Sequence, residues 1–468
     1  MSFKNIGYCL LSIGIVLITG CKKLVEVDPP KNLLVTTNVF NNDNAVIATQ
    51  LAIYAQMQDI PWTFAVETGL SSDELTNFST GQGSIDLYKN ALDATIDGSN
   101  LPWAKIYQLI YQENAILENV QASSGLSKVV RKQSIGEAQF MRAFFYFYLV
   151  NLYGDVPLIT TTDYKVNSSM SRTPKSKVYE QMILDLKSAQ NELSGSYLDE
   201  TDSVVTSDRV RPTIWAASAL LARTYLYNEK FDSAEAMASI VIGNTSLFGL
   251  PGLDSVFLAN SQEAIWQIIP PSSQQFTYEG DIFTLFAPPG GSGMNNSNAI
   301  SPQLLSAFDS NDNRKTKWIG NYVDGTDTFY FPYKYKNNSV DNQNPTEYSM
   351  VMRLAEQYLI RAEARVQQNN LTGAINDINV IRVRAGLASL PFILNKDQAL
   401  SAIAHERQTE LFTEAQRWLD IKRTSTADAI MNFVATKKGG SWNTDKQLYP
   451  LPALEIQGGV NLSQNKGY

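Results

Sequence analysis

The residues best suited to hold a ligand lie between Gln262 and Tyr348, where aromatic rings and side-chain amides stand close together among Gly, Asn, Ser and Pro. A long irregular insertion in a compact protein is usually functional. Tyr and Trp offer large contact areas at a low cost in rotamer entropy. Flat rings beside polar groups suit a ligand that has both apolar faces and hydrogen-bonding groups. We therefore predict a ligand site made by Trp318, Tyr322, Tyr278, Asn295 and Asn296.

The loop region expected after Pro61 adds three candidates, Trp62, Asn77 and Phe78. Among all these residues we select Trp318 as the strongest, because two lysines and a glycine surround it and this polar setting favours an exposed indole. The competing interpretation is that most of these rings pack in a core, where aromatic side chains are common.

Residue types that support catalysis are few. The only histidine, His405, excludes a multi-histidine zinc site, and no G-x-S-x-G motif accompanies it, so we interpret it as part of a charged lattice. Asp73 and Glu74 are expected to cap or brace a turn, since adjacent carboxylates do not flank a substrate bond. We assign no catalytic residue. The alternative is a surface glycoside hydrolase, because the 46 acidic residues leave room for two carboxylates facing each other at about 5 to 10 Å.

A possible calcium loop at Asp309, Asn311 and Asn313 does not match the pattern that calcium requires. Arg314 stands where the sharp-turn Gly belongs, and Gly320 stands where the bidentate Glu belongs. We therefore expect an exposed turn before Arg314, and we assign no metal ligand and no cofactor.

The N-terminus is typical of a secreted lipoprotein. Residues 1–20 have a positive start and an apolar run of signal-peptide length. Small residues just before Cys21 resemble a bacterial lipobox, which makes Cys21 the predicted lipidation site and residues 21–40 a tether. An ordinary signal cleaved nearby is the competing interpretation. The other cysteine, Cys9, lies in the signal, so the mature chain has no disulfide.

The formal net charge of −8 argues against a nucleic-acid partner. Affinity for a phosphate backbone needs a basic surface, and no run of Lys and Arg supplies one.

The most apolar helix is expected within residues 128–160, where hydrophobic residues repeat at helical spacing nearly all round. Such a helix must be covered by other elements of a large domain. Gly154 and Pro157 predict where it ends. Further helices are expected at Asn41–Gln58 and Trp103–Val120.

A repeated pattern of small residues predicts two helical hairpins. Ala222 is followed by Phe231 and Ala234 at the same offsets at which Ala362 is followed by Leu371 and Ala374. Small residues let antiparallel helices approach closely, as in tetratricopeptide-like repeats. A long stretch separates the two copies, so we do not expect a continuous solenoid.

The chain is thus predicted to be mostly α, with tetratricopeptide-like hairpins as a scaffold and a loop-rich insertion that contains short strands at 264–268 and 328–335. We expect one domain over residues 41–468: a helical half (41–261), a ligand region (262–347) and a C-terminal helical part (348–468). In the last part, Gln398–Arg423 is expected to be helical, with its alternating charges in a solvated or inter-helix lattice.

Five segments resemble the SusD/RagB family, the nutrient-binding surface lipoproteins of Bacteroidetes-type bacteria. They are Ser72–Glu74, Trp103–Asn114, the apolar helix with its exit turn at Tyr153–Pro157, the charged stretch from Glu406 to Arg423, and the ending from Pro450 to Tyr468. The order of these segments from Cys21 to the end adds to the likeness.

The resemblance implies a binding protein rather than an enzyme, anchored by lipid at the outer-membrane surface. It further implies a SusC-like TonB-dependent transporter as partner, to which the protein delivers oligosaccharides or, in some members, peptides. Ligand contacts vary within the family, so the resemblance assigns no binding residue.

Overall fold

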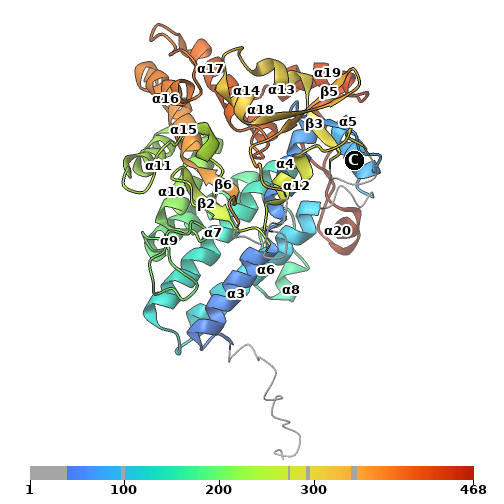
Figure 1. Ribbon diagram of the computed structural model, residues 1–468. Coiled ribbons are helices and arrows are strands. Elements are labelled where there is room, and N and C mark those ends of the chain that lie inside the picture. Colours follow the sequence, from blue (N-terminus) through green and yellow to red (C-terminus); the bar gives the residue numbers. More distant parts are fainter. Residues whose placement is uncertain (1–38, 96–100, 272–274, 291–295, 339–344) are drawn as a thin grey trace, which may run out of the picture.

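The structure is a computed structural model that describes residues 39–95, 101–271, 275–290, 296–338 and 345–468. It is mostly helical, as predicted (Figure 1). The predicted signal, Cys21, nearly all of the tether and Asn295 lie outside the described residues. Within the described ranges, no helix is long and apolar enough to cross a membrane.

The most apolar helix, α7 (Lys128–Tyr153), lies at the centre of the core, as its composition predicts. It begins where the Ser127 side chain accepts a hydrogen bond from Val130 N–H, and it ends at Gly154, whose φ is +77°. Its neighbours are α6 (Leu101–Ala122) and α9 (Lys175–Glu192). Buried Arg142 ties the three helices together, because it donates to both oxygens of Asp185 on α9, at 2.8 and 2.6 Å, and to Asn114 on α6, at 2.8 Å.

The two predicted hairpins are confirmed. The first consists of α10 (Ile214–Tyr227) and α11 (Phe231–Gly243), and the second of α15 (Leu354–Gln367) and α16 (Leu371–Arg384). The four repeated alanines have no exposed area.

The two hairpins stack directly on each other, which the sequence did not predict. Helix α11 packs against α15, where Arg365 and Gln368 each donate to Glu235 at 2.8 Å. Figure 1 shows α9, α10, α11, α15 and α16 as successive layers on one side of the molecule. Residues 244–353 therefore form an insertion between adjacent layers of one helical array.

Two predictions of local structure are wrong. The expected loop after Pro61 is largely helix α4 (Ile60–Ser71), whose mixed composition conceals a buried face containing Phe64 and Leu70. The expected helix Gln398–Arg423 is divided into α17 (Lys396–Glu410) and α18 (Arg417–Arg423). The chain turns between them because Thr413 and Ala415 adopt positive φ values of 54° and 57°.

The loop-rich insertion supplies strands of three two-stranded antiparallel sheets. Strand β2 (Ala264–Ile268), which was predicted, pairs with β6 (Ser349–Arg353), and β4 (Ile319–Asp324) pairs with β5 (Asp327–Pro332). Strand β3 (Asn298–Ile300) pairs with β1 (Leu75–Asn77) from the N-terminal half. The remaining helices are α3 (Asp43–Gln56), α5 (Gln82–Lys89), α8 (Tyr164–Asn167), α12 (Tyr278–Phe283), α13 (Pro302–Ala307), α14 (Asn313–Lys317), α19 (Ala427–Lys437) and α20 (Ala453–Gly458).

The charged lattice of the C-terminal part exists, and it is buried between elements rather than solvated. Glu410 of α17 accepts hydrogen bonds from Arg314 and Arg353, at 2.9 and 2.6 Å, and pairs with Arg384. Burial opposes ionisation of Glu410, but the three guanidinium groups outweigh it and hold its pKa well below the ordinary value. Such a lattice tolerates burial only because its charges are paired.

The expected exposed turn before Arg314 is wrong, because Arg314 is an inner member of this lattice with no exposed area. Asp312, the N-cap residue of α14, forms an ion pair with Arg314 at 2.7 Å. His405 does not join the lattice: it is half-buried on α17, and its imidazole makes no hydrogen bond or ion pair with any residue that the structure describes. Asp73 does brace a turn, through Arg417.

Candidate ligand-binding surface

One pair of predicted site residues is Trp62 of α4 and Tyr278 of α12. Pro61 places Trp62 in the first turn of α4, where the fixed φ of proline suits a helix start. Tyr278 begins α12, which is capped by the side chain of Thr277. The two half-buried rings lie 6.0 Å apart between centroids, tilted by 42°. Folding thus brings together two candidates from distant parts of the sequence.

A second group consists of Phe78, Tyr322 and Phe329, all half-buried. Phe78 follows β1, and its ring meets that of Phe329 on β5 at 5.6 Å with an interplanar angle of 86°. Tyr322 stands opposite Phe329 in the register of β4 and β5, so the two side chains project from the same face of this hairpin.

Residues 296–298 connect the two groups. The Asn296 N–H donates to Ile282 O of α12 at 3.2 Å, and Ser297 O accepts from Phe78 N–H at 2.8 Å. Asn296 has a φ of +57°, a left-handed conformation that asparagine tolerates, and its Oδ1 has no partner among the described residues. Figure 1 shows α4, α12, β3 and β5 gathered on one side of the molecule, away from the stacked hairpins.

We call this group the aromatic surface and define it by Trp62, Tyr278, Asn296, Phe78, Tyr322 and Phe329. The Trp62 indole N–H also finds no acceptor among the described residues, although a buried indole N–H usually has one. The aromatic surface therefore combines apolar rings with one buried donor and one buried acceptor that have no partner among the described residues.

Asn77 lies at this surface, but its amide is already used by its own turn. Its Oδ1 accepts from Ser79 N–H at 3.0 Å, and its Nδ2 donates to Ser79 O at 3.1 Å. Ligand contact through this amide would require both bonds to break.

The prediction that Trp318 is exposed for ligand stacking is wrong. Its indole has no exposed area, and its N–H donates to Leu253 O at 3.0 Å. Its ring lies 5.5 Å from that of Phe257, and the ammonium group of Lys334 lies 5.1 Å from it. The two lysines near Trp318 in sequence belong to α14. Lys317 stays at the surface, where it pairs with Asp254, whereas the indole of Trp318 points into the core.

Sequence reasoning missed two rings. Phe329 links Phe78 to Tyr322, and Phe286, in the loop between α12 and β3, is 64% exposed. The available signal for Phe286 was a lone aromatic residue beside two prolines and two glycines, a composition that keeps a side chain out of a regular core.

Buried acids lie near this surface but have little space around them. Burial raises the pKa of Glu279 to about 7, against a hydrogen bond from Ser349 that lowers it. The crevice that Glu279 shares with Glu414 has a volume of about 20 Å³. That space suits roughly one water molecule and is too small for a sugar ring. No group of His, Cys, Asp and Glu in the described ranges is arranged to hold a metal ion.

Two family models match separate parts of the sequence. The model of the SusD family matches residues 308–468, and a model described as "Starch-binding associating with outer membrane" matches residues 23–226. The chain belongs to the SusD-like family.

Among its relatives, the SusD-like protein P25 of Formosa agariphila is 24% identical over 94% of both chains. The starch-binding protein SusD of Bacteroides thetaiotaomicron is 31% identical over 25% of this chain and 21% of its own length.

Solved structures show the same fold. A SusD superfamily protein from Bacteroides vulgatus matches with a TM-score of 0.78 at 19% identity, over 92% of this chain and all of its own. A laminarin-binding SusD-like protein matches with a TM-score of 0.74 at 24% identity, over 90% of this chain and 99% of its own.

Proposed function

We propose that this SusD-like protein is a cell-surface nutrient receptor that captures an oligosaccharide or polysaccharide and delivers it to a SusC-like TonB-dependent transporter. The observation that carries the proposal is the aromatic surface, where separate chain segments supply two groups of rings that backbone hydrogen bonds of Asn296 and Ser297 connect. Rings of this kind cover the C–H faces of a sugar, and the neighbouring polar groups bind its hydroxyls.

The family supports glycan as the ligand. One matching model is described as starch-binding, one relative is named a starch-binding protein, and one structural neighbour is described as laminarin-binding. Binding of a peptide, which the resemblance allows for some members, is the alternative ligand class.

We further propose that residues 1–20 are removed, that Cys21 is lipidated and that residues 21–40 tether the body, residues 41–468, to the outer membrane. The description "associating with outer membrane" supports this location. More than one acyl chain is needed for stable anchoring, which a lipoprotein cysteine supplies.

Native gels that contain single polysaccharides test the proposal. A receptor migrates more slowly in a gel that contains its ligand and releases no reducing ends on incubation. Release of reducing ends would identify the protein as a surface glycoside hydrolase instead. Unchanged migration with every polysaccharide, together with binding of peptides, would favour the peptide-binding alternative.

A further inference from the structure

A cavity of about 460 Å³ lies between the first hairpin, α15, α17 and α18, and it shares no residue with the aromatic surface. Its wall includes the turn of the first hairpin at Glu229, the α15 residues Glu363 and Gln367, the α17 residues from Leu400 to Arg407, and the end of α18 at Arg423. The stacking of the hairpins therefore creates this space. Small-molecule sites typically have volumes of about 300 Å³ or more, and this cavity is of that size.

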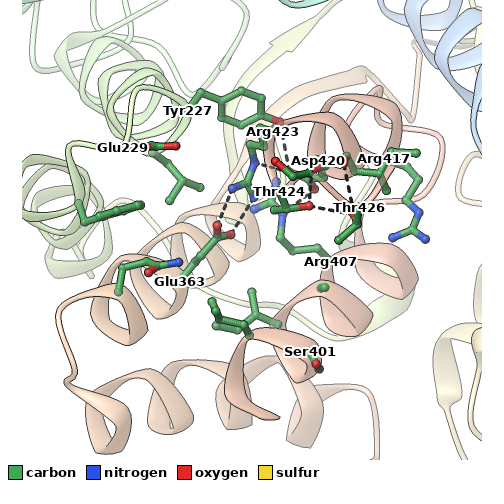
Figure 2. A pocket seen from close by; sticks show the side chains of 18 residues that line it. Tyr227, Glu229, Glu363, Ser401, Arg407, Arg417, Asp420, Arg423, Thr424 and Thr426 are labelled. Carbon is green, nitrogen blue, oxygen red and sulfur yellow. Dashed lines mark hydrogen bonds and ion pairs between the residues drawn. The ribbon is translucent and has the colours of Figure 1, made fainter. Parts of the chain in front are cut away.

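The charges that line the cavity are paired with one another. Arg423 donates to both oxygens of Glu363, at 2.5 and 2.7 Å, and to Asp420 at 2.8 Å. Arg407 donates to the other oxygen of Asp420 at 2.6 Å, and Tyr227 donates to Asp420 at 3.2 Å. Figure 2 shows this cluster on one side of the space.

Arg417, which also lines the cavity, is paired with Asp73. Three arginines are thus matched by carboxylates, so the lining attracts neither anions nor cations strongly. This argues against a phosphate or a free cation as the natural occupant.

Other polar groups around the cavity remain unused. The side chains of Glu229, Gln367 and Ser401 have no hydrogen bond with any residue that the structure describes, and Figure 2 shows Glu229 and Ser401 on different sides of the space. Arg407 is 3% exposed, and its Nη1 also lacks an acceptor within the described ranges. The lining therefore offers both donors and acceptors.

An apolar wall accompanies these groups. Phe231 at the start of α11 and Leu400 on α17 are both half-buried at the cavity. A ring and an aliphatic side chain beside mixed donors and acceptors, without an excess of charge, suit a molecule that has hydroxyl groups around an apolar C–H face.

We propose that this cavity is a second saccharide site, which holds one or two units of a neutral sugar independently of the aromatic surface. The inference rests on the proposed function for its choice of ligand class, but it concerns different residues. A short sugar bound here would contact both hairpins and the C-terminal helices.

The experiment uses the mature chain and saturation-transfer NMR with a panel of neutral sugars: glucose, galactose, mannose, xylose, maltose and cellobiose. Ala404→Trp fills the cavity from the exposed face of α17 without removing a charge. Ser401→Trp is a second filling variant, for the case that the first does not fold. Ala236→Trp, at an exposed position of α11 outside the cavity, is the matched control.

We expect at least one sugar to give a signal that both filling variants lose and Ala236→Trp keeps, with the signal also present in Trp62→Ala. Retardation in polysaccharide gels should be unchanged by Ala404→Trp. The proposal is overturned if no sugar of the panel gives a signal, if the signal survives cavity filling, or if Trp62→Ala alone abolishes it. Because Ala404→Trp and Trp62→Ala alter different surfaces, failure of this site is distinguishable from failure of the proposed function.

Discussion

Asp73 and Arg417 form a two-point ion pair, in which Arg417 Nε donates to Oδ1 and Nη2 to Oδ2, each at 2.7 Å. The pair connects the turn before β1, which positions Phe78, to α18 in the C-terminal part. Both side chains are nearly buried, at 6% exposure for Asp73 and 12% for Arg417, so water is a poor substitute for either partner. Glu74, the next residue, is buried without a hydrogen bond to its carboxylate among the described residues.

Arg417→Met should therefore destabilise the fold strongly, because it leaves the Asp73 charge buried and unpaired beside another acid. Breaking a buried pair on one side costs about 3 to 5 kcal/mol. The matched control is Lys177→Met, which removes a pair with Glu180 whose side chains are 63% and 59% exposed and should cost less than about 1 kcal/mol. Urea denaturation measures both, and equal losses would contradict the structural role of Arg417.

Glu67 predicts a pH dependence of stability. Burial raises the pKa of this carboxyl group to about 8, from an ordinary value of 4.5. Between these values the folded chain holds a proton that the unfolded chain has lost, so the free energy of unfolding should fall as the pH rises through this interval. Glu67→Gln removes the proton equilibrium and should stabilise the fold at pH 8 by about 1 kcal/mol or more relative to its effect at low pH.

Denaturant titrations of wild type and Glu67→Gln, at pH values below and above this interval, measure the difference. Glu180→Gln, at a side chain that is 59% exposed, is the control for replacing an acid by its amide. Parallel profiles for wild type and Glu67→Gln would show that Glu67 stays ionised in the folded state.

The hairpin register predicts that Ala222→Leu or Ala362→Leu overpacks a helix contact. Both alanines have no exposed area, so the larger side chain should cost about 1 to 3 kcal/mol. Ala236→Leu, at an exposed position of α11, is the control. If thermal midpoints are the same for all three variants, the small residues do not set the helix spacing.

Sequence patterns predicted those elements whose burial follows from their own periodicity. Helix α7 is apolar nearly all round, and the hairpins repeat small residues at fixed offsets. The residues within each pattern are therefore enough to predict a buried helix. Trp318 was misjudged because its cover comes from distant segments: Phe257 lies before it in the chain and Phe412 well after it, with Lys334 over both rings. The residues next to Trp318 in the sequence do not indicate these contacts.

The same dependence on distant contacts explains why some predicted ligand residues lie at the aromatic surface and Trp318 does not. Ring content and loop composition led to Tyr278, Phe78 and Tyr322, because half-buried rings are expected in or beside stretches that have few regular elements. Trp62 is half-buried although it lies in helix α4 rather than in the expected loop. The grouping through Asn296 depends on the pairing of β1 with β3 across the whole chain, which no local pattern encodes.

The proposed anchor predicts that Cys21→Ala releases the protein from the membrane fraction while leaving it folded. The lipid would lie outside the described body, so the thermal midpoint of the released protein should match that of the anchored form extracted in detergent. Cell fractionation with an antibody measures the release. Membrane association that persists in Cys21→Ala would count against lipidation at this residue.

The aromatic surface and the misjudged tryptophan together give a prediction that separates binding from stability. Trp62→Ala should weaken retardation in the responsive polysaccharide gel by about 1 kcal/mol or more in binding free energy, the scale of a binding hot spot. Trp318→Ala should instead cost about 3 to 5 kcal/mol of folding stability, because it opens a cavity beneath Phe257 and Phe412. At temperatures where Trp318→Ala is still folded, its glycan binding should equal that of wild type, since its indole has no exposed area. Loss of binding in folded Trp318→Ala, with full binding in Trp62→Ala, would place the ligand away from the aromatic surface.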